Sequence, residues 1–218
     1  MKNILGLNIP ETVEDVCDPK RIALLVYDMQ IGILGQIKNA DEVTRQVLKV
    51  LTVARDVGLR VFFSRHLSLP TKLMGVFQFR IAMTWQRVTS PEQVKPWFLR
   101  DNPGFQITPE LSPRSSEGVF DKLTMSAFEG TWLDLALRDA EINAFIIVGV
   151  ATEVGIEPTV RHGADLGYIP VLVSDACGAG NEEAAKRSLE NLKFMGDAIV
   201  TDTETICANF ATAKRRIP

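Results

Sequence analysis

Histidine and cysteine are scarce in this sequence, which narrows the chemistry that it can support. The 218 residues include two histidines, His66 and His162, and three cysteines, Cys17, Cys177 and Cys207. Two histidines are too few for a histidine-rich metal site, and the cysteines lack the spacing of zinc ligands. Three widely separated cysteines also argue against a disulfide framework. We therefore expect no catalytic metal and no cofactor.

Long apolar runs and blocks of like charge are also missing. No apolar run approaches the ~20 residues that a membrane-spanning helix needs, and the N-terminus has charges and a proline where a signal peptide needs an apolar stretch. The 24 basic and 27 acidic residues give a formal charge of −3. A nucleic-acid partner requires a basic face, and the short basic tail at 214–216 is typical of a solvated end. We expect a cytoplasmic protein that binds a small molecule and neither nucleic acid nor membrane.

Apolar runs alternate along the chain with amphipathic segments, and hydrophobic residues make up 46% of the total. This alternation is typical of a parallel sheet flanked by helices. We predict an α/β fold: a single-domain (1–218), three-layer Rossmann-like sandwich with a mostly parallel central sheet of about six strands. The predicted strands are 22–27, 59–64, 118–122, 144–150, 170–174 and 198–201. The predicted helices are 41–57, 126–140 (opened by a Ser126–Glu129 capping box), 153–166, 182–194 and one from 204.

Two regions lie outside this rhythm. Residues 1–20 form an N-terminal extension. Residues 67–117 are irregular, because six prolines interrupt them while aromatic residues keep them apolar. A segment this long without regular structure is usually functional or interfacial. We expect it to form a pocket wall or a contact between subunits.

Polar residues stand where three of the predicted strands end. Asp28 follows the first strand, Lys122 ends the third, and residues 149–152 lead from the fourth strand into a helix. In open parallel sheets, ligands bind at the carboxyl ends of the strands. An aspartate, a lysine and a helix N-terminus could therefore line one pocket, although each residue alone is as readily explained as a cap or a surface charge.

Five sequence motifs lie between residue 21 and about residue 204. They are LLVYDMQ around Asp28, FDKLTMSAF around Lys122, GVATEVGIEPTVRHGADLGY at 149–168, VLVSDACGAG at 171–180 and the closing GDAIVTDTE. In these segments the sequence resembles the isochorismatase-like hydrolases, also called cysteine hydrolases, which include nicotinamidases and N-carbamoyl amidases. The resemblance implies a site in which an aspartate shuttles protons, a lysine polarises the site and a cysteine attacks an amide carbonyl.

The resemblance also implies a cis peptide bond in the segment after the fourth strand. In this sequence the bond would join Val150 and Ala151. It would direct the backbone amides of Ala151 and of position 155 at a developing oxyanion.

The sequence departs from this family at the nucleophile, because Gly155 stands where most relatives carry the cysteine. Glycine has no side chain that could attack a substrate, so a thioester at this position is excluded. Isochorismatases proper are similar to this sequence here, and they hydrolyse a vinyl ether with an acid and water. By this resemblance Asp28 is expected to be the general acid, Lys122 to bind an anionic part of the substrate, and Gly155 to leave space for a ring or a water.

Other residues could contribute to the same site. His66 follows the second strand, and Trp85 and Arg87 could supply a stacking wall and a carboxylate anchor from the irregular segment. The Asp-x-His metal motif of nicotinamidases is absent, since the chain has Ser64-Arg65-His66 there. Cys177 is better explained as a small buried residue than as a displaced nucleophile.

Three functions remain open from the sequence. The first is vinyl-ether hydrolysis of a small anionic metabolite by acid catalysis with water. The second is an unconventional amidohydrolase of the same family, and the third is a non-catalytic member that binds a small molecule. The apolar residues between 74 and 105, together with the resemblance, also predict a homo-oligomer (a dimer or a tetramer).

Overall fold

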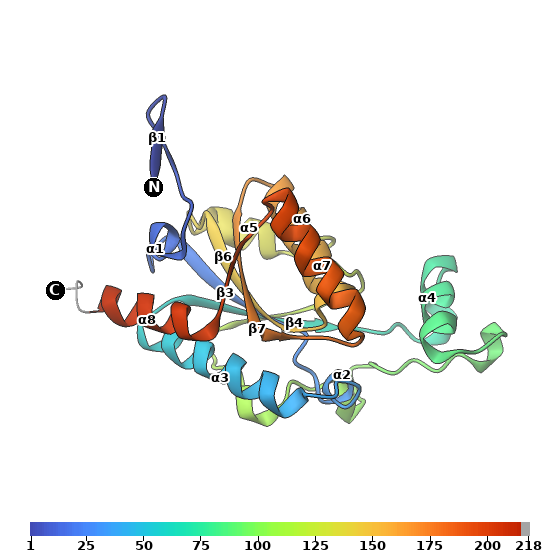
Figure 1. Cartoon of the computed structure of the whole chain (residues 1–218). Coiled ribbons are helices and arrows are strands. Elements are labelled where there is room, and N and C mark those ends of the chain that lie inside the picture. The colour runs from blue at the N-terminus through green and yellow to red at the C-terminus, as the bar shows by residue number, and fades with distance from the viewer. Residues whose placement is uncertain (215–218) are drawn as a thin grey trace.

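A six-stranded parallel sheet organises the chain, and helices cover both of its faces (Figure 1). The computed structural model describes residues 1–214. The strands, in the order in which they lie side by side, are β5 (Gly118–Lys122), β4 (Arg60–His66), β3 (Ile22–Tyr27), β6 (Ala144–Val150), β7 (Ile169–Gly178) and β8 (Ile199–Thr201). This arrangement confirms the predicted three-layer α/β sandwich.

Successive side chains of the central strands point to opposite faces of the sheet and build two cores. In β3, the alternate residues Ile22, Leu24 and Val26 pack on one face, while Ala23, Leu25 and Tyr27 pack on the other. All six of these residues are at most 2% exposed. The strand is buried on both sides, which explains why its sequence is an almost continuous apolar run.

Two groups of helices complete the layers. One face carries α3 (Ala40–Asp56) and α8 (Thr203–Lys214), and the other carries α5 (Leu133–Asp139), α6 (Glu157–Asp165) and α7 (Glu182–Met195) (Figure 1). In α3 the apolar residues Val43, Val47 and Leu51 form the buried stripe that the sequence predicts. None of the helices within residues 1–214 combines the length and the apolar character needed to cross a bilayer.

The predicted helix 126–140 is wrong in its first half, because α5 begins at Leu133. Ser126 does not cap a helix: its hydroxyl accepts the Phe128 amide and pairs with His162. The Ala127 amide donates to Thr159 of α6. These contacts hold the segment after β5 as a loop against α6, so the capping-box pattern at this point is a coincidence of spacing.

Further boundaries differ from the sequence prediction, among them the end of β4, which includes His66. β7 extends to Gly178, four residues beyond the predicted end, with a register shift against β6. The predicted helix 153–166 consists of a π-helical turn, η5 (Thr152–Ile156), followed by α6. Such turns are frequent at functional sites.

The segment 67–117 contains a helix that the sequence does not predict, α4 (Val76–Gln86), together with four short 3₁₀ turns, η1 (Thr71–Leu73), η2 (Pro91–Gln93), η3 (Pro103–Phe105) and η4 (Pro109–Leu111). α4 stands away from the sheet (Figure 1), and none of its residues is buried. Its apolar side chains do not form a single stripe, so the helical period is hidden in the sequence.

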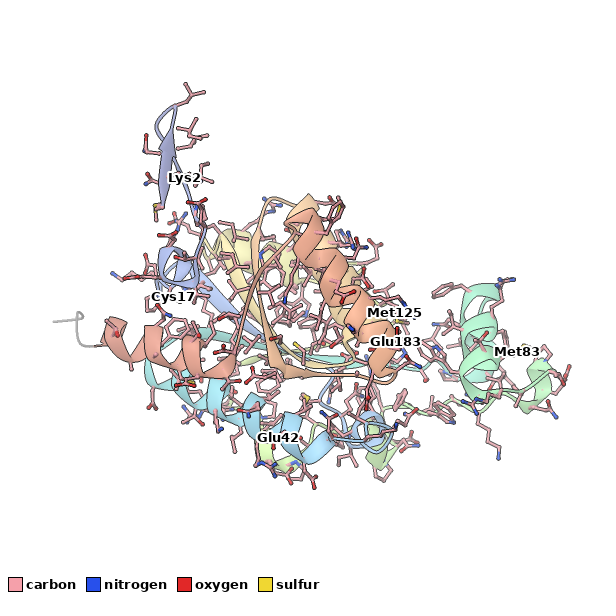
Figure 2. The ribbon with its side chains drawn as sticks, in the orientation of Figure 1. Lys2, Cys17, Glu42, Met83, Met125 and Glu183 are labelled. Carbon is pink, nitrogen blue, oxygen red and sulfur yellow. The ribbon has the colours of Figure 1, made fainter. Side chains whose placement is uncertain are left out.

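The N-terminal extension projects from the body as a hairpin of β1 (Lys2–Ile4) and β2 (Leu7–Ile9), followed by α1 (Val13–Val16), whose Val13 and Val16 join the core. Figure 2 shows Lys2 on the projecting hairpin and Met83 on α4, while side chains fill the space around the sheet. The short helix α2 (Ile31–Leu34) follows the site-bearing end of β3. The basic tail beyond residue 214 lies outside the described residues.

A part-buried ion pair links the end of the irregular segment to α3. Arg55 donates from Nε and Nη2 to the two carboxylate oxygens of Glu117, at 2.7 and 2.8 Å, and the Arg114 amide adds a bond of 2.7 Å. The Glu117 side chain is only 5% exposed. Burial alone would raise the pKa of Glu117, but the hydrogen bonds from Arg55 and Arg114 outweigh it and hold the pKa below its ordinary value.

We expect Glu117→Gln to lower the free energy of unfolding by about 1–2 kcal/mol at pH 7, because it leaves the part-buried Arg55 without its charge partner. A lowered folded-state pKa stabilises the protein above the unfolded value of about 4.3 and loses this effect as the pH falls below it. The difference between wild type and variant should therefore shrink towards pH 3.5 in urea titrations. Glu42→Gln, at an exposed pair with Arg45, should change little at either pH. Equal stability of Glu117→Gln and wild type at pH 7 would contradict the assignment.

Candidate active site

The ends of β3, β4 and β5 bring three polar side chains together. Lys122 Nζ lies 2.7 Å from Asp28 Oδ2, and Ser64 Oγ donates to Asp28 Oδ1 at 2.6 Å. β4 lies between β3 and β5, so Ser64 sits between the other two residues. Asp28 is 4% exposed and Lys122 is 2% exposed. Both carboxylate oxygens of Asp28 therefore accept hydrogen bonds inside the protein.

The ammonium group of Lys122 is enclosed by the protein. Besides Asp28 it contacts the Thr124 carbonyl at 3.2 Å and the face of the Tyr27 ring, 4.3 Å from the ring centroid. Burial lowers the pKa of Lys122, and the Asp28 carboxylate opposes this effect. The prediction that Lys122 binds an anionic part of the substrate is wrong, because its side chain is 0% exposed and fully engaged behind Asp28.

Gln30, two residues after Asp28, holds the surrounding chain in place. Its amide oxygen accepts the His66 backbone amide at 2.6 Å, and its Nε2 donates to the carbonyls of His66 and Phe105 at 3.1 and 2.9 Å. Gln30 itself is fully buried. One side chain thus ties the ends of β3 and β4 to the segment 67–117.

The turn after β6 has the expected cis peptide bond between Val150 and Ala151. The amide of Gly155 donates to the Ala151 carbonyl at 3.1 Å, inside the π-helical turn. The prediction that this amide points at a developing oxyanion is therefore not supported by its direction. The amide of Ala151 remains the candidate donor.

The space beside Gly155 is occupied by Tyr27. A Cβ atom added to Gly155 would overlap the tyrosine hydroxyl oxygen and would lie 2.5 Å from Cζ and 2.7 Å from Cε1. The prediction that glycine leaves room here for a substrate ring or a water is wrong, because the protein's own phenol fills it. Tyr27 is 1% exposed, and its hydroxyl donates to the Met125 carbonyl.

A cavity of about 360 Å³ opens over these groups. Asp28, Val150, Ala151 and Gly155 line its inner part, and it is of the size that small-molecule sites have. The other predicted binding residues line the same cavity: His66, Trp85 and Arg87, with Trp97 and Phe98 beside them. The structure thus brings together every predicted site residue except Lys122, which lies directly behind Asp28. The segment 67–117 forms one wall of this cavity.

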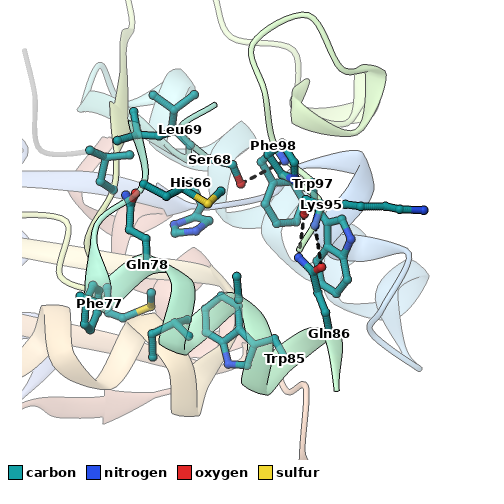
Figure 3. A pocket seen from close by; sticks show the side chains of 17 residues that line it. His66, Ser68, Leu69, Phe77, Gln78, Trp85, Gln86, Lys95, Trp97 and Phe98 are labelled. Atoms are coloured by element: carbon teal, nitrogen blue, oxygen red, sulfur yellow. Dashed lines mark hydrogen bonds between the residues drawn. The ribbon is translucent and has the colours of Figure 1, made fainter. Parts of the chain in front are cut away.

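His66 lines both this cavity and a smaller hollow of about 50 Å³ beside α4. Figure 3 shows the side chains around the smaller hollow. Its ring packs edge-on against Trp85 and Phe98, with centroids 6.2 and 5.8 Å away. Burial, reinforced by the charge of Lys122, lowers the pKa of His66 to about 4. His66 is therefore a neutral imidazole near pH 7, and the smaller hollow holds no charged group of the reaction centre.

Glu153 adds a second carboxylate to the cavity wall. Its Oε1 accepts the Asn181 amide at 2.7 Å, while its Oε2 is buried and has no hydrogen-bond partner among the described residues. A buried oxygen without a partner is unusual and calls for a donor. This oxygen has almost no surface open to the cavity, so a ligand donor reaches it only if the Glu153 side chain turns.

The three cysteines stand apart from this cavity. Cys177 is directed at the Ile147 carbonyl, with Sγ 3.7 Å from the oxygen, and burial raises the pKa of its thiol. A buried, protonated thiol is a poor nucleophile. Within residues 1–214, no three histidine, cysteine, aspartate or glutamate side chains gather so that they could hold a metal ion. The absence of a metal from the reaction stays a prediction.

Sequence reasoning missed four residues of this site: Tyr27, Gln30, Ser64 and Glu153. Ser64 carried a usable signal, because it ends a predicted strand beside the one that ends at Asp28. Tyr27 carried another, since it is a polar-tipped residue at the end of an otherwise apolar buried strand. Nothing in the sequence indicates that the tyrosine reaches Gly155, because that contact depends on how β3 and η5 pack.

The structure thus places an aspartate–lysine pair beside a cis-peptide turn, at the strand ends of a parallel α/β sandwich. Residues 22–205 match the isochorismatase domain family. The chain therefore belongs to the isochorismatase family, and it is a hydrolase of that family.

Individual relatives agree with this assignment. The chain is 29% identical to the ureidoacrylate amidohydrolase RutB of Acinetobacter baylyi, over 92% of this chain and 87% of the relative. It is 31% identical to YecD, an uncharacterised isochorismatase family protein of Escherichia coli, over 79% and 88%. A cysteine hydrolase structure from Pseudomonas syringae has the same fold, with a TM-score of 0.78, 24% identity and coverage of 91% and 96%.

The enclosed ion pair predicts strongly coupled effects on stability. Asp28→Asn should lower the free energy of unfolding by about 3 kcal/mol, and Lys122→Met by a similar amount, because each leaves a buried charge unpaired. The double variant should lose clearly less than the sum of the two. Urea titrations of all four proteins measure this coupling, and strictly additive losses would show that the two groups do not act as a pair.

Proposed function

We propose that this hydrolase cleaves the C–N bond of a small amide or ureide that carries a carboxylate, using a water molecule activated by Asp28 in place of a cysteine nucleophile. The observation that carries the proposal is the position of Asp28. Its carboxylate lines the cavity, accepts hydrogen bonds from Lys122 and Ser64, and has no thiol opposite it at Gly155.

The reaction needs one proton shuttle. Asp28 takes a proton from the water, whose oxygen attacks the carbonyl carbon, and the Ala151 amide stabilises the oxyanion. The C–N bond then breaks, and the proton passes from Asp28 to the leaving nitrogen. The products are ammonia or an amine and a carboxylic or carbamic acid. Lys122 keeps the carboxylate of Asp28 in place during both transfers.

The charges around the cavity support this substrate class. Arg87, at the exposed left-handed end of α4, suits a substrate carboxylate, and Glu153, which lines the same cavity, brings a carboxylate that suits a substrate N–H. A substrate with two carboxylates and no N–H would place negative charge near Glu153 without a donor for it. The likeness to a protein named as an amidohydrolase points the same way.

Vinyl-ether hydrolysis is the second candidate, and glycine at position 155 is the observation that favours it. In this reaction Asp28 would start protonated, deliver its proton to the substrate and leave water to add to the resulting cation. The hydrogen bonds that Asp28 accepts from Ser64 and Lys122 suit the carboxylate form better, so we place this route second.

Product analysis separates the candidates. The purified protein is incubated with N-carbamoyl amino acids, with short amides of dicarboxylic acids and, separately, with isochorismate. We expect ammonia release from members of the first two groups. Pyruvate from isochorismate without ammonia from any amide would overturn the C–N assignment. Tight binding without any turnover would indicate a non-catalytic binding protein.

With a substrate in hand, three variants separate the roles of the side chains. Asp28→Asn should lower kcat by about 10²–10⁴-fold, because it removes the proton acceptor. Arg87→Gln and Glu153→Gln should mainly raise KM, since they contact the ends of the substrate. Pretreatment of the wild type with iodoacetamide should leave the rate unchanged, and inactivation by it would contradict a thiol-free mechanism.

We propose that α4 and the preceding turn η1 bind a second copy of the chain. Leu73, which ends η1, is 66% exposed, and Val76 and Phe77 at the start of α4 are 80% and 56% exposed. Figure 1 shows that α4 stands away from the sheet. Burial of such a patch between identical subunits removes it from water.

Light scattering after size exclusion should therefore report a dimer or a larger closed assembly for the wild type. Val76→Asp combined with Phe77→Ser should shift the mass towards that of one chain without changing the far-ultraviolet circular dichroism. A wild-type mass of one chain at all concentrations would contradict the proposed contact.

A further inference from the structure

Gly155 and Tyr27 come from different parts of the fold, and the Tyr27 side chain occupies the space that a side chain at position 155 would need. Tyr27 is the last residue of β3, and Gly155 lies in η5 at the start of the helix that covers the same face of the sheet. The ring atoms nearest to a Cβ at position 155 would be Cζ and Cε1, at 2.5 and 2.7 Å. Real side chains do not approach this closely, so an alanine or cysteine at 155 and a tyrosine at 27 exclude each other unless one of them moves.

The tyrosine ring is fixed from several sides. Its hydroxyl donates to the Met125 carbonyl, and the Lys122 ammonium rests on its face, 4.3 Å from the centroid. Gly149 in β6, with a φ of 127°, packs against the tyrosine backbone, and a Cβ there would overlap the Tyr27 carbonyl oxygen. The ring therefore has little freedom to swing away from position 155.

We propose that Tyr27 occupies the place of a nucleophilic side chain, so that Tyr27 and Gly155 form a reciprocal pair that closes this site to thiol chemistry while the ring holds Lys122. Tyr27 is a positioning residue in this scheme. Its ring holds the ammonium group of Lys122 in place, and this ammonium group orients Asp28. The glycine at 155 is then a structural consequence of the tyrosine at 27, and not simply the loss of a cysteine.

The phenol does not replace the thiol as a nucleophile. Burial and the nearby Asp28 charge raise the pKa of Tyr27 well above its ordinary value, and its proton is committed to the Met125 carbonyl. A neutral, hydrogen-bonded phenol does not attack a carbonyl. Direct attack by water follows only if the proposed hydrolytic function holds, whereas the steric pairing of Tyr27 and Gly155 does not depend on it.

Thermal melting of a double-variant cycle tests the pair. With Tyr27 present, Gly155→Ala should lower the Tm by about 4–10 °C, because the added methyl overpacks the core. With Tyr27→Val, whose β-branched side chain suits the strand but is too short to reach position 155, the same Gly155→Ala change should shift the Tm by less than about 2 °C. Equal shifts in the two backgrounds, or no shift with Tyr27 present, would overturn the pairing.

Gly163 is the matched control, since it lies on α6 and meets a different ring. A Cβ there would lie 2.5 Å from Phe145 Cε1, so Gly163→Ala should also lower the Tm, and Tyr27→Val should not relieve it. If Tyr27→Val fails to fold, Tyr27→Phe takes its place. It removes the overlapping oxygen but keeps Cζ at 2.5 Å, so it should relieve the Gly155→Ala shift in part. A complete absence of relief would overturn the pairing.

Alkylation of a cysteine introduced at position 155 measures whether Tyr27 blocks access to this position, which a change in packing energy alone does not report. Gly155→Cys is made with Tyr27 and with Tyr27→Val, and each protein is treated with iodoacetamide and analysed by peptide mapping. The thiolate displaces iodide, an S–C bond forms and the thiol proton passes to Asp28 or to solvent. We expect labelling of residue 155 at least about tenfold faster in the double variant, where the thiol can face the cavity beside Asp28.

Equal labelling rates at residue 155, together with a wild-type Tm for Gly155→Cys, would show that Tyr27 blocks nothing. The parent proteins with Gly155 report the background from the three native cysteines. A failure of the wild type to hydrolyse any amide would overturn the proposed function and would leave these melting and labelling results unaffected.

Discussion

The ion pair between Asp28 and Lys122 is the interaction on which the site depends. Its two residues come from strands that are not neighbours, and β4 fits between them with Ser64 as the third partner. An ammonium with no exposed surface tolerates burial only beside a carboxylate. The pairing of Asp28 with Lys122 therefore requires this order of strands and this alignment of their ends. The same pairing holds Asp28 at the wall of the cavity.

Tyr27 links this ion pair to the turn that follows β6. Its ring contacts Lys122 on one side and fills the space beside Gly155 on the other, so a change at either point is felt at the other. If the ring takes the position of an attacking group, as we propose, Asp28 can act only on a mobile nucleophile such as water.

The sequence was sufficient for the layers and for most of the site, because strand burial and strand-end polarity are local signals. The run 22–27 and the positions of Asp28 and Lys122 are read in this way. Prediction from the sequence failed where a local pattern competed with tertiary contacts. Ser126 matched a capping box but is held by α6, and α4 has apolar residues on several sides because it does not pack on its own sheet. The contact of Tyr27 with Gly155 has no local signal at all.

If position 155 is the place of a nucleophile, as we propose, its glycine has two physical explanations, which differ in what surrounds it. If a side chain were merely lost, packing would leave a void or a water-filled space at position 155. Here the space holds a phenol that is hydrogen-bonded, contacts a buried ammonium and has a glycine at 149 that admits its backbone. Several independent contacts fix one ring in one place, as in a packed core. This degree of fit favours a site rebuilt for another reaction course over one that has decayed.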